Sequence, residues 1–293
     1  MMLHQLALIR REVWEHRSLW MTPAAVAVVV SLLVLTSFVA ASGFSEMVDI
    51  AIIGASNVGD NERRAALLAF LVSLSLIFVI SMWVLTVFYS LDSLYAERKD
   101  KSILFWRSLP ITDAETVISK LLTTLTVIPL LSFVAVVATH IVSLLLTAIW
   151  VSKEGGDAGH LIWGSVPLFD TWAAMLVLLL ATPLWLSPFI GWFLFVSAWT
   201  KRSPLLMAFM PIIIVPIFEY VIFRTSILWN AIGDRLSGMP LFHGFDASRF
   251  FDKHELKVTD DSVSLLGQLD IARFLGSPGF WLGLIVCGLL TTA

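Results

Sequence analysis

The chain has 293 residues, of which 58% are hydrophobic and 14% are charged. Soluble domains carry about 45–50% apolar and about 25% charged residues, so both values indicate a chain whose apolar surface is covered by lipid. The formal net charge of -3 argues against a nucleic-acid-binding protein. The single cysteine, Cys287, excludes an intramolecular disulfide and a cysteine-rich zinc site.

The N-terminal segment, residues 2–20, is predicted to form a helix that lies in the membrane surface. Its apolar residues Leu6, Ile9, Val13 and Trp20 recur at roughly helical spacing, and arginines and glutamates fill the positions between them. This pattern is typical of an interfacial helix that precedes the first membrane span. A charged N-terminal tail without defined structure is the alternative.

Six apolar stretches are predicted to be transmembrane helices, because a helix needs about 20 mostly apolar residues to cross the hydrocarbon core. They are residues 23–42, 66–90, 119–150, 172–199, 204–224 and 278–293. The first run is longer than the apolar part of a cleavable signal peptide, about 7–15 residues, which favours a retained helix over a cleaved one. The last is short for a full span, which leaves open a longer chain or a shallow helix. The predicted fold is one all-α, polytopic membrane domain over residues 1–293.

Lysine and arginine concentrate in residues 1–22, 91–120 and 200–203, whereas the short loops 43–65 and 151–171 hold few of them. Positively charged loops face the cytoplasm in most membrane proteins, so both termini are predicted to be cytoplasmic. Residues 225–277 then form an extracytoplasmic segment. Its carboxylates and His254 match no known calcium-loop spacing, so we expect a solvated loop there and no metal site.

The loop between the second and third spans, residues 93–118, holds an aromatic pair within a strongly charged stretch. The charged residues Glu97–Lys101 lead into Phe105 and Trp106, and Pro110 ends the short helix that is predicted here. The T-x-x-E run of residues 112–115 is a capping box that opens the next helix. Large aromatic residues and arginine are frequent interface anchors, so one interpretation is a docking surface. A helix resting on anionic lipid headgroups is the other.

This loop resembles the cytoplasmic loop of ABC-2 type transporter permeases, in which an E-(R/K)-x-x-x-(S/T)-x-x-x-(W/L)-x-S-L-P-like run precedes the third span. The corresponding residues are Glu97, Arg98, Ser102, Trp106, Ser108, Leu109 and Pro110, with Lys120 at the entry of the next helix. A second similar stretch is residues 188–214, which contain the basic turn of Lys201 and Arg202. The layout of six spans after a surface helix also resembles this family.

The resemblance implies a permease subunit of an ATP-binding cassette (ABC) transporter in a bacterial inner membrane, which exports a hydrophobic or amphipathic solute. A separate ATPase subunit would bind ATP and magnesium, because the chain lacks the G-x-x-x-x-G-K-[ST] phosphate loop. A second permease copy or a homologue would complete the complex within the lipid bilayer. The coupling residues that the resemblance implies are Glu97, Arg98, Phe105, Trp106, Arg107, Pro110, Lys201 and Arg202.

Two ionisable residues fall inside predicted spans: His140 in the third and Glu219 in the fifth. A charge at the centre of a span costs about 2.5–3.5 kcal/mol on insertion scales, so such residues usually face a cavity or a partner. Both are therefore candidates for the translocation path, with Glu219 facing a chamber between subunits. The alternatives are a hydrogen-bonded helix contact for His140 and access to water for Glu219.

The chain has no H-E-x-x-H and no G-x-S-x-G run, so we do not expect an enzyme. Two further classes remain open: an ATP-independent carrier or channel, and a membrane-embedded enzyme that acts on lipid. Such an enzyme would need polar groups clustered at one depth. His140, Glu219, His160, His243 and His254 are instead spread over different elements.

Overall fold

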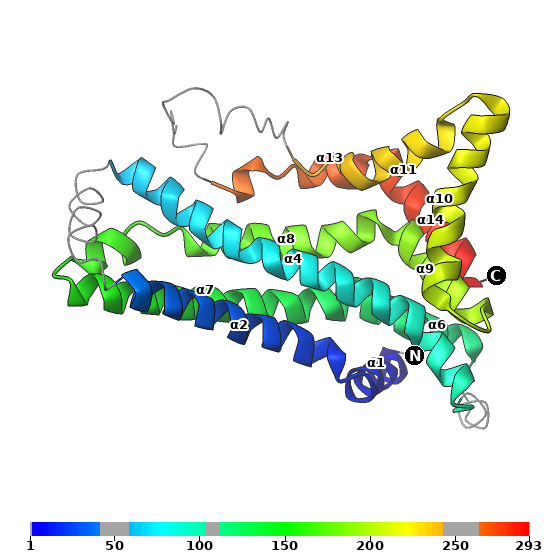
Figure 1. The fold of residues 1–293 in the computed structure, drawn as a ribbon, viewed down its shortest axis with the longest axis horizontal. Helices are drawn as coiled ribbons and strands as arrows, with labels where there is room; N and C mark the ends of the chain where they lie inside the picture. Colours follow the sequence, from blue (N-terminus) through cyan, green and yellow to red (C-terminus); the bar gives the residue numbers. More distant parts are fainter. Residues whose placement is uncertain (1, 42–58, 103–111, 243–263, 293) are drawn as a thin grey trace.

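The computed structural model describes residues 2–41, 59–102, 112–242 and 264–292, and this part of the chain consists of helices and their connecting turns, with an isolated bridge between Phe242 and Leu269 (Figure 1). Five of its helices are long and apolar enough to cross a membrane, as in a multi-pass membrane protein. The prediction of an all-α membrane domain is confirmed at this level. The helices are α1 (Met2–Glu15), α2 (Ser18–Ala41), α4 (Asp60–Lys99), α6 (Asp113–Leu122), α7 (Ile128–Lys153), α8 (Leu168–Trp185), α9 (Ser187–Trp199), α10 (Pro204–Phe223), α11 (Ile227–Ser237), α13 (Ile271–Gly276) and α14 (Pro278–Thr292).

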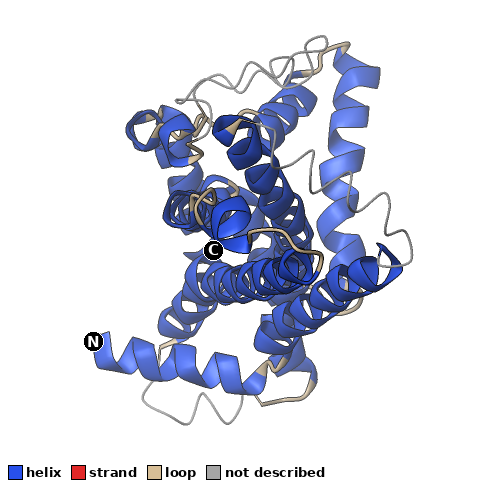
Figure 2. Cartoon of the chain, turned by 90° about the vertical axis from the view of Figure 1, so that its left-hand side faces the viewer, coloured by secondary structure: helices blue, strands red, loops and turns tan. Residues whose placement is uncertain are grey.

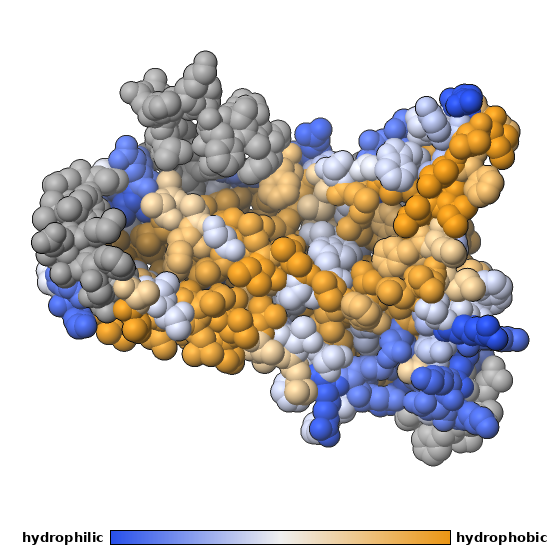
Figure 3. Space-filling view, in the orientation of Figure 1, coloured by the Kyte–Doolittle hydropathy of each residue, from blue (hydrophilic) through white to orange (hydrophobic). Residues whose placement is uncertain are grey.

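The long helices α2, α4, α7 and α8 run alongside one another and form the bundle (Figure 1). Its interior includes Leu19, Met82, Ile128 and Leu179, each at most 1% exposed. Many apolar side chains on the outside of the same helices remain exposed, and Figure 3 shows them as a broad hydrophobic surface along the bundle. Such a surface requires lipid as its solvent.

The third predicted span is a single helical run from Asp113 to Lys153, because a π-helical turn at Thr123–Val127 joins α6 to α7. Three threonine hydroxyls of this turn donate to carbonyls four residues earlier, at 2.7 to 2.9 Å. Pro129 follows directly and has no N–H for the helical ladder. A local widening of the helix accommodates both features.

The fourth predicted span, residues 172–199, consists of two helices. α8 ends at Trp185 and α9 begins at Ser187, with Pro183 inside α8 and Pro188 in the first turn of α9. Two prolines five residues apart remove two backbone donors and favour a break between them. Both sides of the break lie against α14, where Gly279 approaches Trp185 and Gly283 approaches Pro188.

Helix α10 leaves the bundle: it stands upright in Figure 1, whereas α2, α4 and α7 run across the view. Of its side chains, only Ala208 and Pro216 are buried. Ala208 packs in a cluster with Leu91 and Phe193, and the indole of Trp192 donates to the Ala208 carbonyl at 3.0 Å. The start of α10 is therefore fixed to α4 and α9, and the rest of the helix presents apolar side chains on nearly all sides.

Candidate functional site: a buried ion network between α1, α4 and α6

The N-terminal helix α1 lies across the end of the bundle (Figure 2) and places one charged side chain inside it. Glu12 on α1 and Lys120 on α6 are both 0% exposed, and Glu97 near the end of α4 is 4% exposed. The Lys120 Nζ lies 3.0 Å from Glu12 Oε1 and 2.9 Å from Glu97 Oε1. One ammonium group thus joins three helices.

Two further side chains complete the set, which we call the ion network: Arg11, Glu12, Tyr89, Glu97 and Lys120. The Arg11 Nη2 donates to Glu97 Oε1 at 3.1 Å and to Glu12 Oε1 at 2.9 Å. The Tyr89 hydroxyl donates to Glu12 Oε2 at 2.8 Å. Two carboxylates therefore face two cations, and the charge of the ion network balances.

Electrostatics keep the Glu12 carboxylate ionised. Burial by itself raises the pKa of Glu12, but the charge of Lys120, the hydrogen bonds from Tyr89 and Lys120, and the charge of Arg11 together lower it below its ordinary value. A buried ion pair requires this kind of full hydrogen-bonding to compensate for lost hydration. The ion network is thus a stable, charged contact between α1, α4 and α6.

The carboxylates of Glu12, Glu15 and Glu97 come within 4.8 Å of one another, which is a spacing that a metal ion could use. The Lys120 ammonium is already bonded to both Glu12 and Glu97, however, and the Arg11 guanidinium contacts all three carboxylates. Cationic side chains therefore supply the positive charge that a metal would bring. The residues fit a protein ion network and do not fit a metal site.

Arg98 connects the same end of α4 to α9. Its Nη2 donates to the carbonyl oxygens of Ser197 and Thr200, at 2.5 and 2.7 Å. The Ser197 hydroxyl accepts from the backbone amide of Tyr95 at 3.0 Å. Thr200 directly precedes the basic turn of Lys201 and Arg202, whose side chains are exposed. The structure thus places Arg98, from the first stretch that resembles the ABC-2 family, next to the basic turn of the second.

The other predicted coupling residues, Phe105, Trp106, Arg107 and Pro110, lie outside the described residues. The helix after them begins as predicted. The Thr112 hydroxyl accepts from the Glu115 amide, and the Glu115 carboxylate accepts from the Thr112 amide, which confirms the capping box.

His140 is fully buried at a contact between α4, α7 and α8. Its Nε2 lies 3.1 Å from the Ser75 hydroxyl and 3.0 Å from the Leu71 carbonyl, and its Nδ1 accepts from the indole of Trp172 at 3.3 Å. An acceptor role for Nδ1 assigns the proton to Nε2, which fits the Leu71 carbonyl. This arrangement is that of a hydrogen-bonded helix contact, the second of the two interpretations from the sequence.

Glu219 is solvent-exposed and caps another helix. Its carboxylate accepts from the amides of Ile227 and Leu228 at 2.8 and 2.9 Å and from the Thr225 hydroxyl at 2.7 Å. Negative charge at a helix N-terminus is favourable, so Glu219 fixes the turn between α10 and α11. Together with Arg235, which lies over the Trp185 ring and donates to the Gly279 carbonyl at 2.6 Å, it positions α11.

Sequence reasoning placed Glu97 and Arg98 at the site but missed Arg11, Glu12 and Tyr89. One available signal was the spacing of Leu8 and Glu12, which puts both on one face of α1, where the structure buries them. Comparison of the chain with protein-family models, curated proteins and solved structures gave no match.

Proposed function

We propose that this chain is the membrane-spanning permease subunit of an ABC-2 type transporter, which exports a hydrophobic or amphipathic solute and is driven by a separate ATPase subunit. The observation that carries the proposal is the ion network. Through Lys120 and Glu97 it joins α1 to both helices that flank residues 103–111. Those residues hold the Phe105–Trp106 pair that resembles a coupling helix.

The helices on either side of that segment are long and continuous. The ion network can therefore transmit a movement of these helices to α1. α4 runs unbroken from Asp60 to Lys99, and the run from Asp113 continues to Lys153. A push on residues 103–111 would therefore move two spans as rigid bodies. Since Glu12 is bonded to Lys120, α1 would move with them. Such rigid-body motion is a common way to couple distant sites.

Charge distribution supports the orientation that this mechanism requires. Lysine and arginine favour the cytoplasmic side, and ten of the 19 lie in residues 1–22, 91–120 and 200–203. Figure 3 shows a hydrophilic surface over α1 and the adjoining end of the bundle. In this orientation the partner subunit would hold ATP and magnesium in the cytoplasm, and this chain would receive its movement at residues 103–111 and at the Lys201–Arg202 turn.

The proposal is tested by isolating the chain from its native membranes and assaying ATP hydrolysis that co-purifies with it. We expect hydrolysis from a nucleotide-binding subunit that mass spectrometry identifies. Phe105→Ala/Trp106→Ala should reduce the co-purified hydrolysis by at least about tenfold, because interface aromatics of this kind contribute 2 kcal/mol or more, roughly 30-fold in affinity. The matched control is Trp14→Ala, which removes an aromatic that is 73% exposed on α1.

Three outcomes would contradict the proposal. Solute movement by the chain alone in ATP-free vesicles would identify a carrier or channel. Chemical conversion of a lipid by the purified chain would identify a membrane-embedded enzyme. Labelling of a cysteine placed at residue 105 exclusively from the outer side would put the aromatic pair on the wrong side of the membrane.

A further inference from the structure

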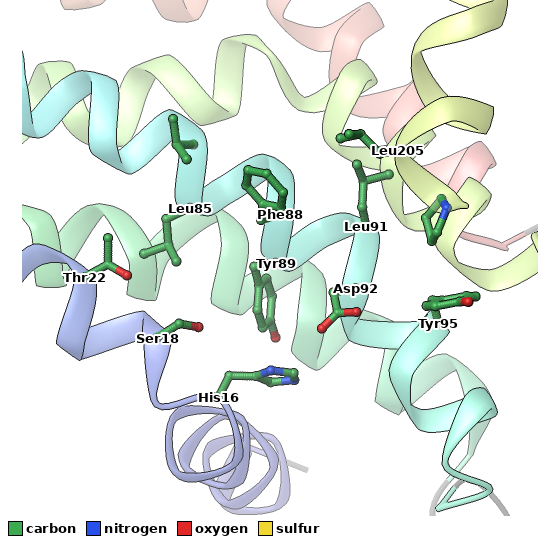
Figure 4. Close-up of a pocket in the computed structure, with 12 residues that line it drawn as sticks. His16, Ser18, Thr22, Leu85, Phe88, Tyr89, Leu91, Asp92, Tyr95 and Leu205 are labelled. Carbon is green, nitrogen blue, oxygen red and sulfur yellow. The ribbon is translucent and has the colours of Figure 1, made fainter. Parts of the chain in front are cut away.

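A cavity of about 410 Å³ opens between the start of α2, the last turns of α4 and the start of α10. It lies beside the ion network but is a separate space. Figure 4 shows its lining residues, of which Ser18, Phe88, Tyr89, Asp92, Tyr95 and Leu205 matter most here.

The polar and apolar groups of this cavity are segregated. Figure 4 shows the oxygen atoms of Ser18, Tyr89 and Asp92 gathered on one side, and the hydrocarbon of Phe88 and Leu205 on the other. Phe88 and Leu205 are 58% and 43% exposed, so the apolar side is continuous with the lipid-facing surface. A cavity with this division matches a molecule that has a polar head and an apolar chain.

The polar side carries one free negative charge. The Asp92 carboxylate forms no hydrogen bond or ion pair with any residue in the described ranges, unlike the carboxylates of Glu12 and Glu97 nearby. The aromatic rings of Phe88, Tyr89 and Tyr95 line the cavity with it. A carboxylate combined with aromatic faces is the chemistry that recognises ammonium and quaternary ammonium groups.

We propose that this cavity binds an amphiphile whose head carries a protonated amine or a quaternary ammonium group. Asp92 neutralises the charge, the rings of Tyr89 and Tyr95 contact the cationic head, and the chain lies along Phe88 and Leu205. The interpretation of this cavity as a substrate site rests on the proposed function. On that basis, the exported solute would be a cationic amphiphile that enters from the cytoplasmic leaflet.

The position of Tyr89 connects the cavity to the ion network. Its ring lines the cavity, while its hydroxyl donates to Glu12 Oε2 at 2.8 Å. The ring of His16, another lining residue, meets the Tyr89 ring edge-on with centroids 5.1 Å apart. An occupant that shifts Tyr89 therefore alters the contact that fixes α1, so occupancy of the site and the position of α1 are coupled.

The test is equilibrium binding of radiolabelled dodecyltrimethylammonium to the full chain in phosphatidylglycerol nanodiscs, without an ATPase subunit or ATP. We expect saturable binding that Asp92→Asn weakens about fivefold, the upper range for one partly exposed charge pair. Tyr95→Leu should weaken it roughly threefold, which matches one exposed cation–π contact. The control is Asp100→Asn, an exposed acid at the end of the same helix that is not among the lining residues.

Companion probes decide what the site recognises. Dodecanol, which lacks the charge, should bind equally well to the wild type and Asp92→Asn, and choline, which lacks the chain, should bind too weakly to compete. Competition by phosphatidylethanolamine discs would identify a membrane lipid as the source of the head group; its absence would point to a free amphiphile. Equal binding of the probe to Asp92→Asn and wild type, or tighter binding of dodecyl sulfate, would overturn the proposal. Since no nucleotide is involved, this result is independent of whether an ATPase partner exists.

Discussion

Lys120 and Glu12 are 108 positions apart in the sequence, yet their charged groups lie 3.0 Å apart in a place that solvent does not reach. Glu97 takes the remaining side of the same ammonium group, at 2.9 Å. A buried ion pair of this kind adds less to the free energy of folding than its Coulomb attraction implies, because both groups lose hydration. Its main consequence is specificity: α1 has one docked position, and it is fixed by charge.

Replacing Lys120 with methionine should lower the free energy of unfolding by about 3–5 kcal/mol, because Glu12 and Glu97 would keep buried negative charges with only Arg11 to balance them. The measurement is chemical unfolding in detergent, followed by tryptophan fluorescence. Glu12→Gln/Lys120→Met should recover part of this loss, since it removes a charge from each side of the pair.

The control for this experiment is Lys99→Met, which removes an exposed charge from the end of α4 and should change stability by less than about 0.5 kcal/mol. Equal effects of Lys99→Met and Lys120→Met would show that the ion network contributes nothing specific.

The docking of α1 should weaken in acid. The pKa of Glu12 in the folded chain lies below its ordinary value of 4.5, so the ionised carboxylate stabilises the fold at pH values above about 4.5. As the pH falls through the lowered pKa, Glu12 takes up a proton and this stabilisation is lost. The charged and titratable groups that face it are Arg11, Lys120, Glu97 and His16, whose Nε2 lies 3.8 Å from Glu12 Oε2, with the Tyr89 hydroxyl as donor.

The measurement is hydrogen exchange of α1 amides at a series of pH values, corrected for the intrinsic dependence of exchange on pH. Protection should stay level from pH 7 to about pH 5 and decline below about pH 4.5. Glu12→Gln should remove the decline because no charge remains to titrate at that position. A decline of the same size in Glu12→Gln would assign the effect to other carboxylates.

Substitution of His140 can distinguish a structural role of this residue from a role in transport. Each of its ring nitrogens is engaged, by Trp172 on one side and by Leu71 and Ser75 on the other. His140→Leu should therefore lower stability by about 1–3 kcal/mol, because the partly buried Trp172 indole loses its acceptor, whereas the Leu71 carbonyl keeps the Ser75 hydroxyl as a donor. Transport per folded chain should stay unchanged in reconstituted vesicles.

A matched variant on the same helix is Ser143→Ala, one turn further along α7, whose hydroxyl is buried without a hydrogen-bond partner. It should be close to neutral in both assays. A selective loss of transport in His140→Leu, at unchanged stability, would instead place His140 on the solute path.

The parts of the fold that depend on local pattern could be predicted from the sequence. Apolar runs of about 20 residues identify helices that can span a bilayer, and the Thr112–Glu115 capping box marks where α6 begins, because both signals are local. The break at Leu186 also has a local cause, because Pro183 and Pro188 both lie within the span that is predicted at residues 172–199.

The ion network could not be predicted, because its members are brought together by packing. Within residues 2–20, the spacing of Leu6, Ile9, Val13 and Trp20 predicts a face that contacts the membrane surface, and it says nothing of Leu8 and Glu12 on α1, which the structure buries against the bundle. The helix is rotated toward Lys120, a partner that hydrophobic periodicity does not reveal. The role of Glu219 could not be predicted for the same reason. It lies on α10 but caps α11, by accepting from amides that are eight and nine positions away in the sequence.

Helices α9 and α14 approach so closely at Gly191 that no larger residue fits. A Cβ atom added to Gly191 would lie 2.9 Å from the Cα and 3.1 Å from the carbonyl oxygen of Cys287, and neither backbone atom can move aside alone. Gly191→Ala should therefore force the helices apart and lower stability by about 1–3 kcal/mol. Thermal unfolding in detergent is the measurement.

The matched control is Gly288→Ala, next to Cys287 on α14, where an added Cβ meets nothing within 4 Å. This change should be neutral or slightly stabilising, because alanine favours a helix by up to about 1 kcal/mol over glycine. The contrast isolates the close approach from any general effect of glycine in a helix. Equal responses of the two variants would mean that α14 does not pack against α9 at this position. The contact between Gly191 and Cys287, which fixes α9 at the end of the fourth predicted span, would then have to be revised.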